Sequence, residues 1–488
     1  MAFTEFCCRS GGSNLNAGTR TGNSTEPGTS ASFTYASGNW VASTGVFTAA
    51  SGNPSTDGVA VGDFASVYVD GSTVTGFVGR VTAVTSTTIT VSLTAKSGTA
   101  PTDGTGNRTL KIGGAWAGPS GTTAFPFGFI EQGMKNTTGN SPRVNLKNDQ
   151  TYSITAAMTH TGASGGTQST IVAFQGYTTS YGDGGKATID GGTSGASYVL
   201  LTIAGTTSSV HLEDLCFQNN GATGSSDATS EIASAHRVVV NSVRGSGLVV
   251  ASGTITECET YSCNQSNTAG KAGISLSAAN AVRCIAHDNS GSNTDGFIGI
   301  AGTSTFVNCI ADTNGRRGFS VAANFSIGTL IGCDAYNNGS HGITVSEGST
   351  GRCTYVVENC NMVKNGGYGL QGSVSGNSVA HTGGVRNNGY GTGTQANTSG
   401  ATNLPVSQPS EVSPVTYASG VTPWTDPANG DFRISLAAAK AAGRGSFTET
   451  QASYAGTVAY PDIGAAQHQD SGGSSGVRSV NIRGGADQ

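Results

Sequence analysis

Charged residues are scarce in this sequence. Asp, Glu, Lys and Arg make up 11% of the 488 residues, against about a quarter in ordinary globular proteins. The 24 basic and 29 acidic residues leave a net charge of −5, with no basic stripe. Proteins that bind nucleic acid concentrate Lys and Arg on one face, so nucleic acid is not an expected partner.

Long apolar runs are also missing. The N-terminus, MAFTEFCCRS, carries Glu5 and has no hydrophobic stretch of the kind found in a secretory signal. The most apolar segment, YVLLTIAG, is far shorter than the roughly 20 residues that cross a bilayer. We therefore expect folding in a cytoplasm and no membrane insertion. The ten Cys are then better interpreted as reduced thiols than as a disulfide framework.

Glycine and small polar residues are abundant instead. The chain has 75 Gly, and short runs of Val, Ile and Thr alternate with Ser, Asn and Gly. A hydrophobic content of 36% is too high for a disordered chain. Short β-branched runs separated by turn residues are typical of an all-β protein.

A repeat of 24 to 27 residues runs through the middle of the chain. The segment CIADTNGRRGFSV matches CDAYNNGSHGITV, which begins 24 residues later, at six of thirteen positions. The same Cys recurs in five successive repeats, at Cys258, Cys284, Cys309, Cys333 and Cys360. An Asn stands five residues after four of them, at Asn289, Asn314, Asn338 and Asn365. A further step of this Asn column is expected at Asn388.

Such a period indicates one supersecondary unit that is repeated and stacked. The leucine consensus of leucine-rich repeats is missing, and what remains is short strands joined by Gly and Asn bends. This pattern predicts the coils of a parallel β-helix, stacked at a strand spacing of about 4.8 Å. Cys and small residues would form a narrow core, and the Asn column would hydrogen-bond along itself. A Gly before each apolar pair, at Gly273, Gly296, Gly318, Gly342 and Gly369, is expected to supply bend conformations.

With these repeats, from about residue 210 to 392, the chain resembles the right-handed parallel β-helix proteins of the pectate-lyase-like superfamily. The C-terminal segment, DPANGDFRISLAAAKAAGRG to YPDIGAAQHQD, is similar to closing segments of bacteriophage β-helix proteins. The resemblance implies a tailspike or tail fibre whose β-helix shaft attaches to polysaccharide on the host cell surface. It also implies a homotrimer located in the virion, assembled in the host cytoplasm, with other virion proteins as partners.

Two other functions stay open, because this fold carries many activities. One is a polysaccharide lyase or glycoside hydrolase, acting as a depolymerase. The other is a capsid-surface decoration or fibre protein without a receptor role.

Three regions are expected along the chain. Residues 1–115, with alternating segments such as VGDFASVYVDG, predict a small β-barrel or sandwich that would attach to the virion. Residues 116–400 form the parallel β-helix (solenoid), and AWAGPSGTTAFPFGF at its start would cover the first coil. Residues 401–488 form a C-terminal cap and tail, in which Ser435 and Gly443 would bracket a short helix. The fold class is therefore all-β.

If each column Cys points inward, the residues one and three positions later point outward. The later position holds Tyr261, His287, Asp312 and Tyr336, the aromatic and polar side chains that a glycan-binding face offers. The earlier position holds Ile285 and Ile310, and apolar residues there suggest a face covered by another subunit. The alternative is a solvated sheet face with scattered apolar residues. A loop at 219–230 is the alternative place for a binding site.

No catalytic residue can be assigned from the sequence. Glycoside hydrolysis uses two carboxyl groups about 5–9.5 Å apart. Asp288 with Asp312, or Asp312 with Asp334, would give such a pair on neighbouring coils, as any acidic β-helix does by chance. Arg316 and Arg317 fall at a bend. No metal site and no cofactor are expected.

Overall fold

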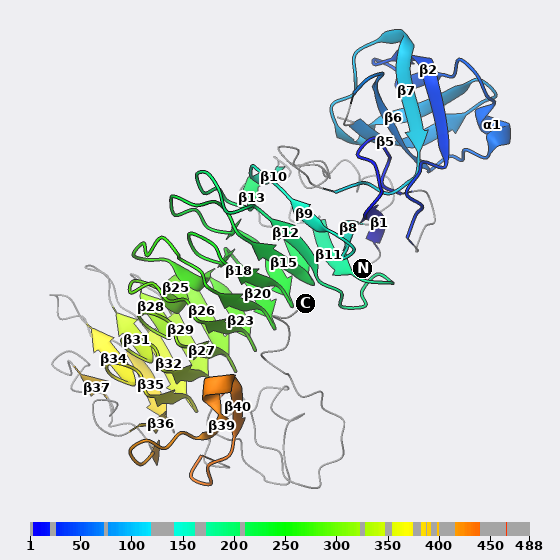
Figure 1. Cartoon of the computed structure of the whole chain (residues 1–488). Coiled ribbons are helices and arrows are strands. Elements are labelled where there is room, and N and C mark those ends of the chain that lie inside the picture. The colour runs from blue at the N-terminus through cyan, green and yellow to red at the C-terminus, as the bar shows by residue number, and fades with distance from the viewer. Residues whose placement is uncertain are drawn as a thin grey trace. The chain divides into compact units, whose positions relative to one another are not determined.

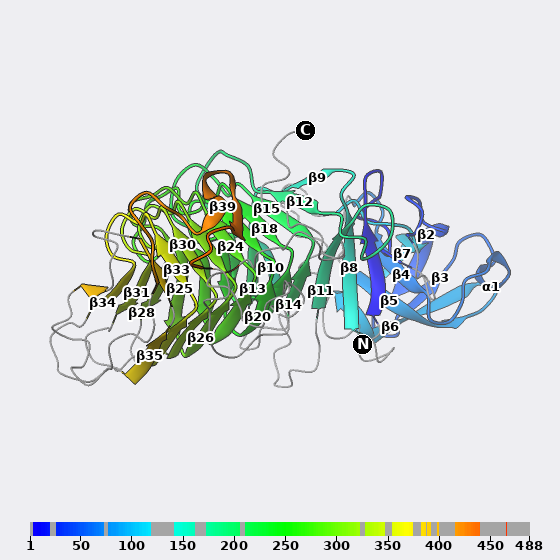
Figure 2. The same cartoon turned by 90° about the horizontal axis from the view of Figure 1, so that it is seen from below.

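The computed structural model describes residues 3–19, 26–72, 77–118, 141–161, 172–204, 210–322, 327–346, 354–373, 382–386, 388–391, 398–399, 415–439 and 465. The chain divides into two compact units, Met1–Ala222 with Ala228–Val239, and Thr223–Asp227 with Val240–Gln488. In both units the chain winds through stacked coils of short parallel strands, which Figure 1 and Figure 2 show from two directions. The prediction of an all-β parallel β-helix is confirmed.

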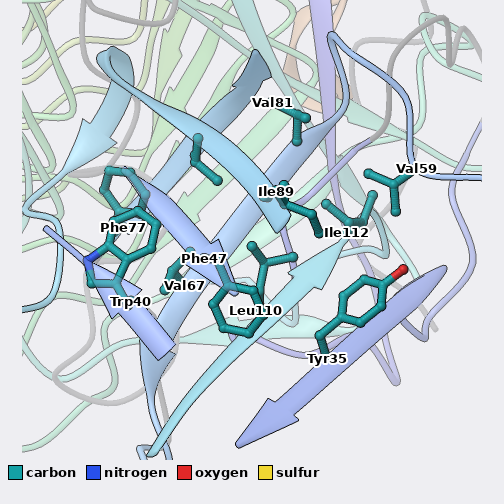
Figure 3. Close-up of a cluster of buried hydrophobic side chains, with 12 residues drawn as sticks. Tyr35, Trp40, Phe47, Val59, Val67, Phe77, Val81, Ile89, Leu110 and Ile112 are labelled. Atoms are coloured by element: carbon teal, nitrogen blue, oxygen red, sulfur yellow. The ribbon is translucent and has the colours of Figure 1, made fainter. Parts of the chain in front are cut away.

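The first unit contains a closed barrel with the strand order β2-β3-β6-β5-β4-β7. Its elements are β2 (Phe33–Val41), β3 (Val46–Thr48), α1 (Pro54–Asp57), β4 (Phe64–Val69), β5 (Phe77–Val84), β6 (Thr88–Gly98) and β7 (Gly104–Ile112). Alternation of apolar and polar residues directs one face of each strand inward. Trp40, Phe47, Phe77 and Leu110 are fully or almost fully buried there (Figure 3). The small β domain is thus a barrel rather than a sandwich.

One strand of the N-terminal region lies outside the barrel. β1 (Phe3–Cys8) pairs in parallel with β8 (Ser141–Lys147) and so belongs to the coils. Trp116 stacks on Phe6 with 5.2 Å between ring centroids and 4° between planes. The region 1–115 therefore holds a strand of the coils as well as the barrel. Beyond Gly118, the aromatic segment expected to cover the first coil lies outside the described residues.

The coils contribute strands to three parallel faces, called here the first, second and third sheets in chain order; the third consists of two separate sheets, one in each unit. In the first unit, the first sheet has β1, β8, β11 (Val172–Tyr177), β14 (Val210–Glu213) and β17 (Ser234–His236). The second sheet has β9 (Thr151–Ser153), β12 (Ala187–Asp190) and β15 (Leu215–Gln218). The third sheet has β10 (Met158–Thr161), β13 (Leu201–Ala204) and β16 (Thr229–Ser230). β18 (Val239–Asn241) contains the division between the units.

The second unit repeats this arrangement. Its first sheet has β20 (Gly253–Thr256), β23 (Ala279–Val282), β26 (Thr303–Val307), β29 (Ile327–Ile331), β32 (Thr354–Glu358) and β35 (Thr382–Arg386). Its second sheet has β21 (Glu259–Tyr261), β24 (Ile285–His287), β27 (Ile310–Asp312), β30 (Asp334–Tyr336), β33 (Asn361–Val363), β36 (Gly389–Tyr390) and β38 (Val415–Thr416). Its third sheet has β19 (Leu248–Val250), β22 (Ala272–Ser277), β25 (Asp295–Ala301), β28 (Phe319–Ala322), β31 (Ile343–Ser346), β34 (Leu370–Ser373) and β37 (Thr398–Ser399).

The repeated Cys and Asn form two inward columns in the second unit. All five column Cys are 0–1% exposed, and the described cysteines are free thiols. The Asn amides bond from coil to coil: Nδ2 of Asn289 donates to Oδ1 of Asn314 at 2.7 Å, and Asn314 donates likewise to Asn338 at 2.9 Å. Asn338 continues the chain of bonds to Asn365, again at 2.9 Å. Because every amide is buried, the ladder also fixes the register of the coils.

The ends of these columns differ from the expected pattern. Asn388 does not continue the Asn column, because Gly389 is opposite Asn361 in the register, which places Asn388 opposite Cys360. Its Oδ1 accepts a 2.8 Å hydrogen bond from the Cys360 N–H. At the other end, Cys263 takes the Asn position, and its N–H donates to Oδ1 of Asn289 at 2.8 Å.

The column glycines have a different role from the one expected. The left-handed corners before and after each second-sheet strand are formed mostly by other residues: Glu257, Arg283, Asn308 and Asn359 before, and Ser262, Asp288, Thr313, Asn337 and Lys364 after, with φ of 50–57°. The glycines are needed because the coils approach closely. A Cβ on Gly318 would lie 2.7 Å from the Gly342 carbonyl oxygen and 2.9 Å from Nδ2 of Asn338. The bend interpretation is therefore wrong for Gly273, Gly296, Gly318 and Gly342, which are not among the positive-φ glycines.

The C-terminal region adds a small hairpin. β39 (Trp424–Asp426) and β40 (Asp431–Ile434) pair antiparallel around the 3-10 turn η3 (Pro427–Asn429); they are drawn in orange in Figure 1. The start of the predicted helix is not helical, since 437–439 form a turn. Its remainder, up to Gly443, lies outside the described residues, as does the tail after residue 465.

Candidate functional site

The four residues predicted to bind glycan lie in one row on the second sheet. Tyr261 pairs with His287, His287 with Asp312, and Asp312 with Tyr336, on the neighbouring strands β21, β24, β27 and β30. Each strand contributes one of these side chains, on the face opposite the inward Ala column. The structure therefore brings the four residues together.

Most of this row is covered by the chain itself. Tyr336 is 6%, Asp312 only 2% and His287 9% exposed. Trp424 and Phe432 of the C-terminal hairpin pack edge-on against Tyr336, with ring centroids 5.5 and 6.1 Å away. The expectation that these three side chains face solvent is therefore wrong. Their binding of glycan remains a prediction, and for Tyr336 it would require the hairpin to move.

The same hairpin accounts for the outward isoleucines. Ile310 is 4% exposed and belongs to a cluster with Tyr417, Trp424 and Ile434, against which Ile285 also packs. This face is thus covered within one chain. The isoleucines no longer argue for a trimer, which remains a prediction from the resemblance alone.

His287 lies between two carboxylates. His287 lies 2.9 Å from Glu259 through Nε2 and 2.8 Å from Asp288 through Nδ1. Burial lowers the pKa of His287, but the hydrogen bonds to Asp288 and Glu259 outweigh it and raise the pKa to about 9. The ring is therefore charged at pH 7. Tyr261 stacks on it with 5.3 Å between centroids.

A second group of polar side chains lies at the start of the third sheet and was missed in the sequence. Backbone hydrogen bonds from Gly296 to Arg317, from Gly318 to His341 and from Gly342 to Tyr368 align these coils. Asp295, Arg317, His341 and Tyr368 consequently form one column, each just before a column glycine. The repeat itself indicated this column, since the residue before the glycine is polar or aromatic in four successive coils.

Within this column, the Asp295 carboxylate forms an ion pair with Arg316. Asp295 is fully buried, and Arg316 holds both its oxygens, through Nε at 2.7 Å and Nη2 at 2.6 Å. Arg317 reaches only the Ser320 hydroxyl with its guanidinium, at 3.3 Å from Nη1, and its buried Nε has no acceptor in the described chain. Burial lowers the pKa of Arg317, the charge of Asp295 opposes this, and the neighbouring Arg316 adds to the lowering. Within the described ranges, no carboxylate pairs with the side chain of Arg317.

Neutral side chains follow Arg317 in this column. His341 stacks on Tyr368 with 5.6 Å between centroids, and its Nδ1 accepts the Tyr368 N–H at 3.0 Å. Burial lowers the pKa of His341, and the charge of Arg317 lowers it further, so the ring is neutral at pH 7. Thr344 is paired with Ser320 in the register and is fully buried, and its hydroxyl has no partner in the part of the chain that the structure describes.

The remaining candidates have structural partners. In the loop at 219–230, Asn219 donates to Asp190 at 3.1 Å, and Asp227 pairs with Lys271 at 2.9 Å. Among the described side chains, no group of three His, Cys, Asp or Glu is placed to hold a metal ion. The helices of the described residues include none long and apolar enough to cross a membrane.

Comparison with known proteins agrees with the fold. A family model described as "Right handed beta helix region" matches residues 222–388, the coils that carry the Cys and Asn columns. No curated protein matches the chain. Among solved structures, the mannuronan C-5 epimerase AlgE4 A-module of Azotobacter vinelandii is similar, with 15% identity, a TM-score of 0.40 and coverage of 57% of this chain and 80% of that one.

Two further solved structures are similar at lower TM-scores. The catalytic domain of a GH87 α-1,3-glucanase in complex with nigerose has 11% identity, a TM-score of 0.34 and coverage of 80% of this chain and 87% of that one. The periplasmic alginate epimerase AlgG has 12% identity, a TM-score of 0.29 and coverage of 58% and 77%. At such values, function has to be argued from the residues of this chain.

Proposed function

We propose that this chain binds a polysaccharide that carries acidic groups, through Arg317, His341 and Tyr368. The observation that carries the proposal is Arg317, a partly buried guanidinium whose neighbouring carboxylate is taken by Arg316. An acidic group on a sugar would supply the missing charge-assisted hydrogen bonds.

The surroundings of Arg317 suit a sugar better than an isolated ion. The stacked rings of His341 and Tyr368 are both half-buried, so they leave aromatic surface on which a sugar ring can pack. Because His341 is neutral, its imidazole hydrogen-bonds to hydroxyls without adding a second charge. Asp295 is not available as an acid or base, since both its oxygens are held by Arg316. The column is therefore a binding site rather than a catalytic one.

We further propose that this binding serves attachment of a bacteriophage particle to its host, as a tailspike or tail fibre does. The support is the resemblance of the repeats and of the C-terminal segment to such proteins, together with a separate N-terminal barrel. Immunogold labelling of purified virions would test the location, and an absence of label from the particles would contradict it.

The binding proposal is tested by calorimetry with the full chain and two model ligands. Arg317→Ala should weaken binding of a polyuronate by about tenfold or more, and wild-type binding should fall with added salt. Arg317→Ala should not bind a neutral glucan more tightly than the wild type does. Arg433→Ala is the matched control, because Arg433 is exposed and pairs only with Asp431 in the described chain. Equal polyuronate affinity of the wild type and Arg317→Ala would refute the proposal.

Cleavage of a glycan is a second candidate function, at a different place. Glu259 and Asp288 are both partly exposed and are joined through one imidazole ring. Two hydrogen bonds and one ring separate them, a span of the order used by glycosidases, about 5–9.5 Å. Cleavage is supported if the wild type releases reducing ends and Glu259→Gln does not. The control, Glu257→Gln on an exposed corner, should release them like the wild type. No release by the wild type from any tested glycan would exclude it.

A further inference from the structure

The first unit carries two polar columns on the outward face of its first sheet. In one, His211 pairs with Ser234, and in the other Glu213 pairs with His236, on the neighbouring strands β14 and β17. His211 and Glu213 alternate along β14 with buried apolar residues. All four side chains therefore point away from the core, on the same side of the sheet.

Ser234 and His211 form a close pair. The Ser234 Oγ and His211 Nδ1 are 2.8 Å apart. When Nδ1 accepts the hydroxyl proton, Nε2 carries the ring hydrogen and faces Oε2 of Glu213 at 3.9 Å. Serine, histidine and carboxylate thus follow one another in the order of a nucleophile, its base and the group that orients the base.

The other oxygen of Glu213 is held in place. Oε1 lies 3.3 Å from Nδ1 of His236 and 3.2 Å from Nη2 of Arg237. Arg237 is itself fixed by two hydrogen bonds, of 2.6 and 2.7 Å, to the buried Asp214. These contacts orient the Glu213 carboxylate and leave Oε2 for His211.

The electrostatic setting keeps His211 neutral. Burial lowers the pKa of His211 below 6.5, and His236 and Arg143 lower it further, while Glu213 opposes them. A neutral imidazole at pH 7 can accept a proton from serine. About a third of the His211 side chain is exposed, at 31%, so a substrate can reach it.

We propose that Ser234, His211 and Glu213 hydrolyse a carboxylic ester, of the class of an O-acyl group on a sugar. The Ser234 Oγ bonds to the acyl carbon while its proton moves to Nδ1 of His211. His211 then gives this proton to the alcohol oxygen as the acyl C–O bond breaks. A water molecule, deprotonated by the same imidazole, then bonds to the acyl carbon of the acyl-serine. The bond from this carbon to the Ser234 Oγ breaks, the imidazole returns the proton to Oγ, and the acid leaves. Glu213 is a positioning residue that stabilises the charged imidazolium.

The experiment uses the full chain with two probes. A fluorophosphonate should modify Ser234, as identified by peptide mass spectrometry of the wild-type protein. Hydrolysis of p-nitrophenyl acetate should fall by about 100-fold or more in Ser234→Ala and in His211→Gln. Thr188→Ala, which removes a half-buried hydroxyl from the second sheet of the same unit, should hydrolyse the ester at the wild-type rate.

The pH profile separates chemistry from stability. Hydrolysis should rise with pH through the pKa of His211, because only the neutral ring accepts the proton. Glu213→Gln should move this rise to lower pH, since Glu213 raises the pKa of His211. A merely structural role of Glu213 would not move it. A wild-type chain in which Ser234 stays unmodified, or a Ser234→Ala variant with full hydrolysis, would overturn the proposal.

Discussion

Asn361 donates a hydrogen bond from Nδ2 to Oδ1 of Asp334 over 3.0 Å, between paired positions of β33 and β30. The C-terminal region binds to both residues. Tyr417 donates to Oδ1 of Asn361 at 2.5 Å, and the Ala465 N–H donates to Oδ2 of Asp334 at 3.0 Å. A buried carboxyl and an amide on the second sheet therefore hold the segment that covers Tyr336 and Ile310.

The stability of the second unit should depend on pH through Asp334. Burial raises the pKa of Asp334 from 3.8 to about 7, although the hydrogen bonds from Ala465 and Asn361 oppose it. Since the folded pKa is the higher one, the folded state holds its proton more tightly than the unfolded state. The resulting stabilisation is complete below pH 3.8 and is lost as pH rises to about 7. The difference in the free energy of unfolding amounts to about 4 kcal/mol.

Asp334→Asn removes this titration and keeps the shape of the side chain. Urea unfolding between pH 4 and pH 8, followed by tryptophan fluorescence, should show a smaller fall in stability with pH for the variant than for the wild type. Asp426→Asn is the control, because Asp426 is exposed on the hairpin. Parallel pH curves for the wild type and Asp334→Asn would contradict the assignment.

Removal of one amide from the Asn ladder should destabilise the coils. Asn314→Ala deletes bonds to Asn289, Asn338 and the Ala286 carbonyl and leaves buried groups without partners. Each such group costs about 1–3 kcal/mol. Asn280→Ala on the outward face of β23, where the residue is exposed, should change the free energy of unfolding by less than about 0.5 kcal/mol. Similar chemical denaturation midpoints for the two variants would show that the ladder contributes nothing.

The repeat period predicted the ladders because stacking makes equal positions in successive coils neighbours in space. The ladder prediction was wrong only at the ends of the columns, where Cys263 stands at an Asn position and Asn388 at a Cys position. The cover over Tyr336 was not predictable in this way. It depends on a contact between Trp424 and a strand about 90 residues earlier, and no period links the two. The Arg317 column was missed for another reason. Arg316 and Arg317 are adjacent in sequence, and only the fold shows that the guanidinium of Arg316 binds both oxygens of Asp295 while that of Arg317 does not.

Gly318→Ala should be destabilising even though the backbone there needs no left-handed conformation. The added Cβ would lie 2.7 Å from the Gly342 carbonyl oxygen and 3.1 Å from the Ala335 Cβ. Relief requires the coils to separate, at a cost of about 1–3 kcal/mol. At Gly28 an added Cβ meets nothing closer than 3.9 Å, so Gly28→Ala is the matched control. Thermal melting of both variants decides the matter, and an unchanged melting temperature for Gly318→Ala would contradict the close packing.

Tyr336→Ala tests whether the row on the second sheet is surface or core. Tyr336 lies beneath Trp424 and Phe432, so loss of its ring leaves a cavity under the hairpin. Large-to-small changes of buried aromatic residues cost about 3–5 kcal/mol. The variant should therefore lose stability and change the fluorescence of Trp424. Tyr261→Ala, at the end of the row where the ring is half-buried, should cost markedly less. If Tyr336→Ala melted like the wild type but no longer bound glycan, the hairpin would be a displaceable cover and the row a binding face.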